Sequence, residues 1–321
     1  MNLLEYRLLG KTGLRVSRLC FGTLTLGPLQ AHLPLEEGAA LLAEAYRCGI
    51  NFWDTAEHYQ NYAYLRLALK KIQTLPVIAT KTYAYDRAGA QASFEKARRE
   101  MDIDTVPIFL LHEQESALTL KGHREALDFF LEAKAKGLIG AVGISTHTVA
   151  AVRAAAEAGH LDVLHALINY KGIGIKDGTV EDMLKALSGA YKKGLGIYGM
   201  KALGGGHLIS TAEKALKFVK NLKELHSFAV GMASSEELLV NLHYCQGLKP
   251  PPEIEARLSL KKRRLEIEEW CIGCGSCVEK CPQGALSLEK EEPVRAVVDP
   301  ERCILCGYCG AYCPEFCIKI F

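Results

Sequence analysis

The sequence predicts an α/β protein: a (β/α)8 TIM barrel over residues 1–249, a linker over residues 250–264, and a small C-terminal α+β domain over residues 265–321. Three observations predict this fold. Eight short apolar segments alternate with helical segments over about 245 residues, which is the order and length of such a barrel. Pro250–Pro252 end the pattern, since three prolines fit neither a helix interior nor a central strand. Two cysteine runs of identical spacing then follow.

The barrel elements can be taken in order. Residues 6–16 form a predicted hairpin that turns at Gly10-Lys-Thr-Gly13 and caps the N-terminal end of the barrel. Apolar periodicity predicts helices such as Leu35–Cys48, His123–Lys136 and Val180–Lys193. The predicted strands are Arg18–Phe21, Asn51–Asp54, Val77–Lys81, Val106–His112, Ile139–Ser145, Val163–Asn169, Gly196–Lys201 and Ser227–Gly231.

An open, doubly wound sheet is the structural alternative to a barrel. Such a sheet usually carries a glycine-rich turn after its first strand, with the pattern G-x-G-x-x-G. The corresponding segment here, Gly22-Thr-Leu-Thr-Leu-Gly27, fits that pattern poorly. The sequence therefore favours the barrel.

Composition and charge exclude several classes of protein. The chain has 321 residues, 49% of them hydrophobic, and 39 basic residues against 37 acidic ones. Without a basic excess we expect no nucleic-acid partner, and no apolar segment is long enough to predict a membrane span. The first residues show no signal-peptide core, so we expect a cytoplasmic protein whose thiols stay reduced. The basic stretch Lys261–Arg264 is interpreted as a solvated linker face, or alternatively as a docking site for an acidic partner.

Both cysteine runs have the spacing C-x2-C-x2-C-x3-C-P. Together they hold eight of the twelve cysteines: Cys271, Cys274, Cys277 and Cys281 in the first run, and Cys303, Cys306, Cys309 and Cys313 in the second. Thiolates spaced this closely on a tight loop reach three corners of a 4Fe–4S cubane, and the fourth corner needs a cysteine from elsewhere. Zinc binding and a disulfide framework are the alternatives. Zinc sites pair two knuckles instead, and disulfides need a secretory context.

The two runs resemble those of bacterial two-cluster ferredoxins, in which the fourth cysteine of each run ligates the other cluster. This resemblance implies two 4Fe–4S clusters. Cys271, Cys274, Cys277 and Cys313 would hold cluster 1, and Cys303, Cys306, Cys309 and Cys281 would hold cluster 2. Cys317, four residues after Cys313, is the one further cysteine that we expect near a cluster.

Four polar residues follow consecutive predicted strands of the barrel. Asp54 ends the second strand and Tyr59 lies in the loop after it, while Lys81 ends the third strand and His112 the fourth. All four are therefore expected at the C-terminal end of the barrel, where active sites form in this fold. A tyrosine has a pKa of about 10, and a neighbouring ammonium held by a carboxylate would lower it toward the range of a useful acid. Each residue alone has a structural explanation, but the set predicts an acid-catalytic site.

At these residues the chain resembles the aldo-keto reductases. The resemblance covers residues 5–245, and the motifs that carry it run from Phe21-Gly22-Thr23 to His112. The resemblance implies a barrel that transfers a hydride from NADPH to an aldehyde or ketone, a small-molecule carbonyl substrate. Tyr59 would be the general acid, Asp54 and Lys81 would tune its pKa, and His112 would orient the carbonyl.

The nicotinamide contacts that the resemblance implies depart from the family pattern. The usual Ser-Asn pair is Ser145-Thr146 here, the usual glutamine is Asn169, and Met200 takes the place of an aromatic residue. At the 2′-phosphate position, Gly231 and Glu237 stand where NADP-preferring members have basic residues. The cofactor could therefore be NADP or NAD. The implied contacts are Gly22, Thr23, Ser145, Thr146, Asn169, Met200, Lys201, Gly204, Ser234 and Asn241.

Gly204–Gly206 and the predicted helix start near Ser234 could bind a phosphate. The alternative is purely structural. Glycine triplets often form turns, and Ser234 with Glu237 fits a capping box.

Three functions stay open at this point. The first is an NAD(P)H-linked carbonyl reductase whose cluster domain docks a redox partner protein or stabilises the enzyme. The second is a ferredoxin-linked reductase that uses cluster electrons directly or through a flavin, because clusters carry single electrons and nicotinamides carry hydrides. The third is an electron-transfer subunit with a catalytically quiet barrel. Since the linker replaces the usual C-terminal substrate loop, we also predict that the cluster domain leans over the barrel mouth.

Overall fold

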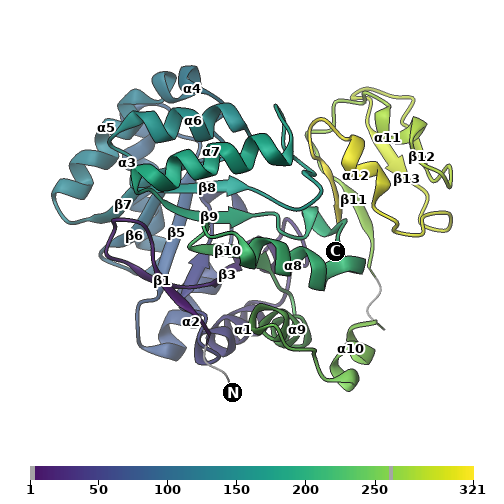
Figure 1. The fold of residues 1–321 in the computed structure, drawn as a ribbon, viewed down its shortest axis with the longest axis horizontal. Coiled ribbons are helices and arrows are strands. Elements are labelled where there is room, and N and C mark those ends of the chain that lie inside the picture. Colours follow the sequence, from purple (N-terminus) through teal and green to yellow (C-terminus); the bar gives the residue numbers. More distant parts are fainter. Residues whose placement is uncertain (1–3, 260–262) are drawn as a thin grey trace.

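The computed structural model describes residues 4–259 and 263–321. Within these residues, eight parallel strands close into a barrel in the order β10-β3-β4-β5-β6-β7-β8-β9 (Figure 1). The strands are β3 Leu19–Gly22, β4 Phe52–Asp54, β5 Val77–Thr82, β6 Val106–Leu111, β7 Ile139–Thr146, β8 Val163–Leu167, β9 Gly196–Met200 and β10 Ser227–Gly231. Each of the eight predicted strands is present, and the closed barrel confirms the predicted fold class. Strands β6 and β9 end one residue earlier than predicted and β8 ends two residues earlier, at Leu167. Residues with positive φ angles, Glu113 and Lys201, follow closely after β6 and β9.

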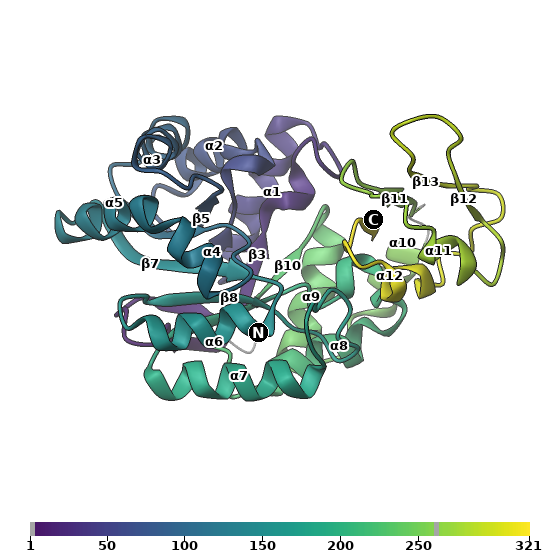
Figure 2. The same ribbon diagram turned by 90° about the horizontal axis from the view of Figure 1, so that it is seen from above.

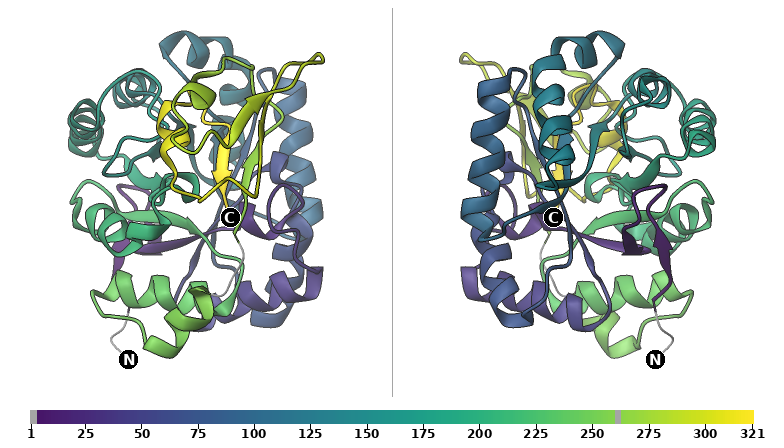
Figure 3. Two further views of the ribbon diagram at one scale, coloured as in Figure 1. Left: turned by 90° about the vertical axis from the view of Figure 1, so that its right-hand side faces the viewer. Right: turned by 90° about the vertical axis from the view of Figure 1, so that its left-hand side faces the viewer.

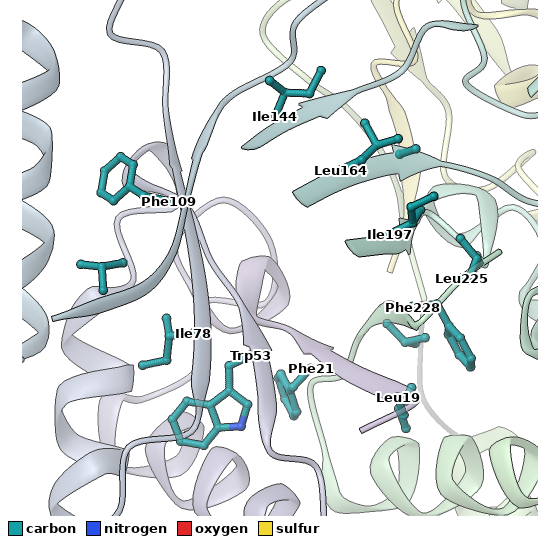
Figure 4. Packing of buried hydrophobic residues seen from close by; sticks show 14 of the residues in the cluster. Leu19, Phe21, Trp53, Ile78, Phe109, Ile144, Leu164, Ile197, Leu225 and Phe228 are labelled. Atoms are coloured by element: carbon teal, nitrogen blue, oxygen red, sulfur yellow. The ribbon is translucent and has the colours of Figure 1, made fainter. Parts of the chain in front are cut away.

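Helices surround the barrel and cover its outer face. They are α1 Leu35–Arg47, α2 Tyr62–Ile72, α3 Arg87–Met101, α4 Ala117–Gly122, α5 Arg124–Ala135, α6 Val149–Ala158, α7 Val180–Lys193, α8 Ala212–Asn221 and α9 Ser235–Gln246, with short 3-10 helices η1 Thr23–Leu26, η2 Glu57–Tyr59, η3 Gly204–Gly206 and η4 Ile209–Thr211. Alternate residues of each strand point outward beneath them (Figure 4). Among these residues, Phe21, Trp53 and Phe109 are fully buried in the main hydrophobic cluster. No helix in the described residues is both long and apolar enough to cross a membrane.

The predicted N-terminal hairpin is present as β1 Tyr6–Leu8 and β2 Arg15–Ser17, which pair antiparallel. Leu9 and Val16 are fully buried against residues of the barrel interior, among them Phe52 and Ile108. A Cβ atom on Gly10 would lie 2.3 Å from the backbone nitrogen of Gly196, where β9 begins. The hairpin therefore closes the N-terminal end of the barrel, as the sequence predicted.

The linker contains a helix, α10 Pro252–Ser259, that packs against α9. It begins at the last of the three prolines, because a proline fits the first position of a helix, where no backbone donor is needed. Within the predicted basic stretch, Arg264 is exposed and pairs with Glu266 at 3.1 Å. Lys261 and Lys262 lie outside the described residues.

The C-terminal part forms two small antiparallel sheets and two short helices. Strand β11 Leu265–Ile267 pairs with β14 Ile318–Ile320, and β12 Leu286–Leu288 pairs with β13 Ala296–Val298. Helices α11 Ser276–Glu279 and α12 Tyr308–Tyr312 lie within the two cysteine runs. The small core consists largely of aliphatic side chains and cysteines.

This C-terminal unit lies at the end of the barrel opposite the hairpin (Figures 1 and 2). Seen from that end, it stands in front of the barrel (Figure 3). Strand β14 contacts η3, which follows β9, and the His207 ring bonds the Ile318 carbonyl at 2.9 Å. Phe316 packs with Ile173, Leu208 and Ala215 in a cluster shared with the barrel loops. These contacts confirm that the C-terminal domain leans over the barrel mouth.

Candidate active site and cysteine cavities

A buried ion pair lies at the centre of the barrel mouth. Lys81 Nζ lies 2.8 Å from both carboxylate oxygens of Asp54 and donates a third hydrogen bond to the Thr55 carbonyl at 2.7 Å. Both side chains are nearly inaccessible to solvent. Burial opposes ionisation of Asp54, but Lys81, His165 and the hydrogen bonds that it accepts hold its pKa below the usual range. The pair is therefore charged, and all three ammonium donors of Lys81 are used.

Two residues beneath this pair were not expected from the sequence. The Tyr198 hydroxyl donates to Asp54 Oδ1 at 2.8 Å, and the His165 ring stacks on Tyr198 at 3.8 Å between centroids. Burial lowers the pKa of His165 to about 3, so this imidazole is neutral. Both residues occupy inward-facing positions in apolar strands, so their alternation in β8 and β9 was the signal that could have found them.

Tyr59 and His112 complete the predicted set of four. The Tyr59 ring lies 5.0 Å from Lys81 Nζ and 5.9 Å from the His112 ring, measured to ring centroids. Burial and the Lys81 charge hold the pKa of His112 well below its ordinary value, so its imidazole is neutral. The structure thus brings together all four residues that the sequence singled out.

The pKa of Tyr59 is shifted in the direction opposite to our prediction. Burial, followed by the negative charges of Asp54 and Glu113, raises it well above 10. Lys81 does not offset this shift, because its three hydrogen bonds go to Asp54 and Thr55 and none goes to the Tyr59 hydroxyl. The hydroxyl is therefore fully protonated at neutral pH.

A second polar group at the mouth joins His147, a candidate contact from the sequence, to Tyr83 and Glu113, which the sequence did not single out. Tyr83 stacks on His112 at 4.3 Å between centroids and donates its hydroxyl to Glu113 Oε2 at 2.8 Å. His147 Nε2 lies 3.8 Å from Glu113 Oε1. Burial opposes ionisation of Glu113, but His147 and His112 and the Tyr83 hydrogen bond lower its pKa to about 2. Glu113 directly follows His112 in the sequence, which was the available signal.

The residues predicted to hold the nicotinamide carboxamide already have partners in the protein. Ser145 Oγ accepts from the Glu113 amide at 2.9 Å, and Thr146 Oγ1 accepts from the Thr148 amide at 2.9 Å. The Asn169 amide nitrogen donates to the Ile173 and Lys201 carbonyls, and its oxygen accepts from two loop amides. A nicotinamide that bound to these side chains would have to replace some of these hydrogen bonds. The nicotinamide contacts of these residues stay a prediction.

The glycine triplet after β9 forms a close contact between the domains. A Cβ on Gly205 would lie 2.9 Å from the Phe316 ring, and one on Gly206 would lie 1.9 Å from the Ile320 carbonyl oxygen. Gly204 packs against Leu208. The structural alternative therefore accounts for the triplet, since the C-terminal strand occupies the space beside it. Met200 is buried at the end of β9.

The other predicted cofactor residues have structural partners or are buried. Thr23 donates to the Asp54 carbonyl, and Gly22 lies close to the backbone of β10. Ser234 caps α9 by accepting from the Glu237 amide, which is one half of the predicted capping box, and the Glu237 carboxylate accepts from the Ala233 amide at 2.7 Å. Asn241 is buried on the same helix.

The eight cysteines of the two runs line two separate cavities. Each measures about 320 Å³, part of it open to solvent. Cys271, Cys274, Cys277 and Cys313 line the first cavity, and Cys281, Cys303, Cys306 and Cys309 line the second. Each cavity therefore takes three cysteines from one run and the fourth from the other. This is the grouping that the resemblance to two-cluster ferredoxins implies.

The thiols are placed as cluster ligands would be. Backbone amides donate to sulfur at Ala285–Cys281, Ala296–Cys271 and Cys317–Cys313, at 3.3–3.5 Å. Such N–H···S bonds stabilise thiolates around iron–sulfur clusters. No three His, Cys, Asp or Glu side chains of the described residues converge closely enough for a single metal ion. All twelve cysteines are described and all are free thiols. The donor set therefore fits cubanes better than zinc or disulfides.

Cys317 lies where the sequence placed it, beside the first cavity. Its sulfur is 3.3 Å from that of Cys313 and the side chain is buried. Of the other cysteines outside the runs, Cys20 and Cys245 are buried and Cys48 is partly buried, as expected for small apolar residues.

Comparison with known proteins agrees with this geometry. Residues 18–224 match the aldo/keto reductase family, and residues 270–317 match the 4Fe-4S dicluster domain. L-galactose dehydrogenase of Arabidopsis thaliana is 29% identical over 224 residues, covering 65% of this chain and 68% of that protein. The uncharacterized oxidoreductase YrpG of Bacillus subtilis is 47% identical over 58 residues, 17% of this chain and 16% of that protein.

Solved structures show the same barrel. A protein from Pseudomonas aeruginosa assigned to the aldo-keto reductases superposes with a TM-score of 0.62 at 25% identity, covering 80% of this chain and 95% of that chain. The holo form of an aldo-keto reductase from Bacillus halodurans superposes with a TM-score of 0.64 at 17% identity and the same coverage. The chain belongs to the aldo/keto reductase family, carries a 4Fe-4S dicluster domain, and is an iron–sulfur oxidoreductase.

Proposed function

We propose that this oxidoreductase reduces the carbonyl group of a small molecule at the barrel mouth, with Asp54, Tyr59, Lys81 and His112 as its catalytic residues. The observation that carries the proposal is the arrangement of these four. A charged, buried Asp54–Lys81 pair lies beneath the Tyr59 ring, and the neutral His112 lies beside that ring.

Each residue has a distinct part in this reaction. Tyr59, fully protonated because its pKa is raised, donates its hydroxyl proton to the carbonyl oxygen. The Lys81 ammonium, fixed by Asp54, supplies positive charge near the phenolate that remains. Neutral His112 orients the carbonyl oxygen without adding a charge. A reduced NAD(P) bound at the mouth would supply the hydride to the carbonyl carbon.

We also propose that the eight run cysteines ligate two 4Fe–4S clusters in the two groups that line the cavities. Protein purified without oxygen is then expected to hold about eight irons, and Cys274→Ala to lose about half of them while the barrel stays folded. A single metal ion per cavity would contradict this assignment.

A ferredoxin-linked reductase is the second candidate, and one contact favours it. Phe316 follows Cys313, a lining residue of the first cavity, by three positions, and its ring lies 6.1 Å from that of His147 at the mouth. Electrons from a cluster in that cavity would therefore have a short route to a flavin or substrate there. Comparing NADH, NADPH and a reduced viologen as electron donors distinguishes the two candidates.

The test common to both candidates is Tyr59→Phe. We expect kcat/KM for a panel of aldehydes and ketones to fall by about 10²–10⁴-fold, the usual contribution of general acid catalysis. Iron content and melting temperature are expected to stay unchanged. Tyr85→Phe, at an exposed tyrosine, is the matched control and should retain full activity. If Tyr59→Phe retained activity with every donor, the proposed role of these four residues would be wrong.

A further inference from the structure

Two lysines from different domains meet at one aromatic ring. Lys201 directly follows β9 of the barrel, and Lys319 lies in β14 of the C-terminal domain. Their Nζ atoms lie 5.5 Å and 3.6 Å from the centroid of the buried Phe316 ring. The φ angle of Phe316 is +51°, which is uncommon for a bulky residue and costs free energy that its surroundings must offset. The domain contact therefore places both amino groups near this ring. Burial lowers the pKa of Lys201 and lowers that of Lys319 to about 7, so the protonated form of each is disfavoured.

No ion pair within 4.0 Å joins either lysine to a carboxylate of the described residues, and the carboxylates that act on them from farther away are chiefly those of Glu113 and Glu268. Lys319 is only 4% exposed, and its ammonium donates to the Phe316 carbonyl. An ammonium has three donors, so this bond leaves Lys319 incompletely satisfied. Its other contacts are with the rings of Phe316 and Trp270, and lysines are almost never buried so deeply without an anionic partner.

Two glutamates are near enough to influence these lysines, but each has other constraints. Glu113 accepts the Tyr83 hydrogen bond and faces His147. Glu268 is partly buried, and burial raises the pKa of its carboxyl. A further negative group beside the two lysines would stabilise their ammonium forms, which burial and their mutual repulsion disfavour.

The lysines are connected to the proposed catalytic residues by direct contacts. The Phe316 ring lies against that of His147, and His147 lies 3.8 Å from Glu113. Glu113 in turn holds Tyr83, whose ring stacks on His112. A molecule whose carbonyl lies at Tyr59 and His112 would thus have the lysines on one side of it.

We propose that Lys201 and Lys319 bind an anionic group, a carboxylate or phosphate, of the molecule that occupies the barrel mouth. The C-terminal domain then contributes a binding residue to the site, in addition to its clusters. The binding of an anion does not depend on the proposed function. Only the identity of the molecule that carries the anion rests on it, since that molecule would be either the carbonyl substrate or the nicotinamide cofactor.

Binding can be measured without turnover. Calorimetric titration of the iron-loaded full chain with inorganic phosphate and with pyruvate is expected to show binding of both. Lys201→Gln and Lys319→Met should each weaken that binding by about tenfold, the loss expected for one charge-assisted hydrogen bond. Methyl pyruvate, which lacks the charge, should bind wild type and variants alike. Lys214→Met is the matched control, since this exposed lysine also lies over an aromatic ring, that of Tyr170 at 4.9 Å.

Two further measurements identify the source of the anion. If the substrate carries it, the variants raise KM for pyruvate and leave KM for methyl pyruvate and the Kd of NADPH unchanged. If the cofactor carries it, the Kd of NADPH rises instead. Either outcome supports the anion site.

The proposal fails if wild type binds neither phosphate nor pyruvate, or if both variants bind them as tightly as wild type does. A purely structural role for Lys319 would show as a loss of melting temperature and iron content in Lys319→Met. In that case Lys201→Gln alone decides the question. Because no step requires catalysis, an active Tyr59→Phe variant would refute the proposed function and leave this inference standing.

Discussion

The two ends of the barrel are closed in opposite ways. At the N-terminal end, the hairpin inserts Leu9 and Val16 among apolar side chains of the barrel interior. At the C-terminal end, the second domain covers charged and polar residues such as Lys201 and places its own Lys319 beside them. Of the buried side-chain atoms without a hydrogen-bond partner among the described residues, three lie toward this end, on His112, Gln114 and His207, while the others are on Arg18, just before β3 begins, and on Trp53.

This difference places the contacts that stabilise the fold at the N-terminal end of the barrel and the groups that bind and react at the C-terminal end. Apolar contacts between well-packed side chains stabilise the fold and bind nothing. Buried polar groups that lack partners cost free energy, and they are retained where a ligand is to satisfy them. Substitutions at the N-terminal end should therefore change stability alone, whereas those at the C-terminal end should change binding, pH dependence or domain contact.

The largest effect is expected at the hairpin. Leu9→Ala removes a fully buried side chain from the apolar closure, and comparable core truncations lower the free energy of unfolding by about 2–5 kcal/mol. Urea denaturation measures the loss. Leu8→Ala is the control, because Leu8 is 61% exposed and its truncation should change stability little. Equal effects at Leu8 and Leu9 would show that the hairpin does not pack as described.

Low pH should destabilise the fold mainly through groups at the C-terminal end of the barrel. Burial lowers the pKa of His147 from 6.5 to about 4. Between these values the unfolded chain binds more protons than the folded one, so the free energy of unfolding falls as pH falls from 6.5 to 4. The shift corresponds to a contribution of about 3 kcal/mol.

Urea midpoints across this pH range test the contribution of His147. His147→Asn should reduce the slope of the curve in part, because burial also lowers the pKa values of His112, His165 and His207. The control is His32→Asn, at an exposed histidine, which should leave the curve as it is in wild type. Parallel curves for His147→Asn and wild type would contradict the assignment of this pH dependence to His147.

The sequence predicted what local patterns determine. The strands follow from apolar runs, the cysteine groups from spacing, and the meeting of Asp54 and Lys81 from their positions at the ends of neighbouring parallel strands. The direction of the Tyr59 pKa shift was missed, because it depends on burial and on where the Lys81 hydrogen bonds go. Lys319 and Phe316 could not be placed either, because their neighbours come from a domain contact across more than a hundred residues of chain.

The domain contact itself can be broken at Gly206. An alanine Cβ there would lie 1.9 Å from the Ile320 carbonyl oxygen, and the φ angle of +96° is accessible essentially only to glycine. We expect Gly206→Ala to displace β14 at a cost of about 1–3 kcal/mol and to expose the linker to limited proteolysis. In the control, Gly189→Ala, nothing lies within 4 Å of the added Cβ in α7, so stability should rise slightly. Unchanged proteolysis of Gly206→Ala would mean that the two domains do not need this close approach.

The smallest expected effect decides between two interpretations of Ser234, near the same end of the barrel. As the N-cap of α9, Ser234 accepts from the Glu237 amide, so Ser234→Ala should cost about 1 kcal/mol. Ser234→Asp should restore that stability, because aspartate caps helices equally well. If Ser234 also holds a cofactor phosphate, Ser234→Asp would stabilise the fold but weaken NADPH binding through charge repulsion. Equal NADPH affinity in Ser234→Asp and wild type would leave capping as the role of Ser234, and the charged end of the barrel would then bind anions through its lysines instead.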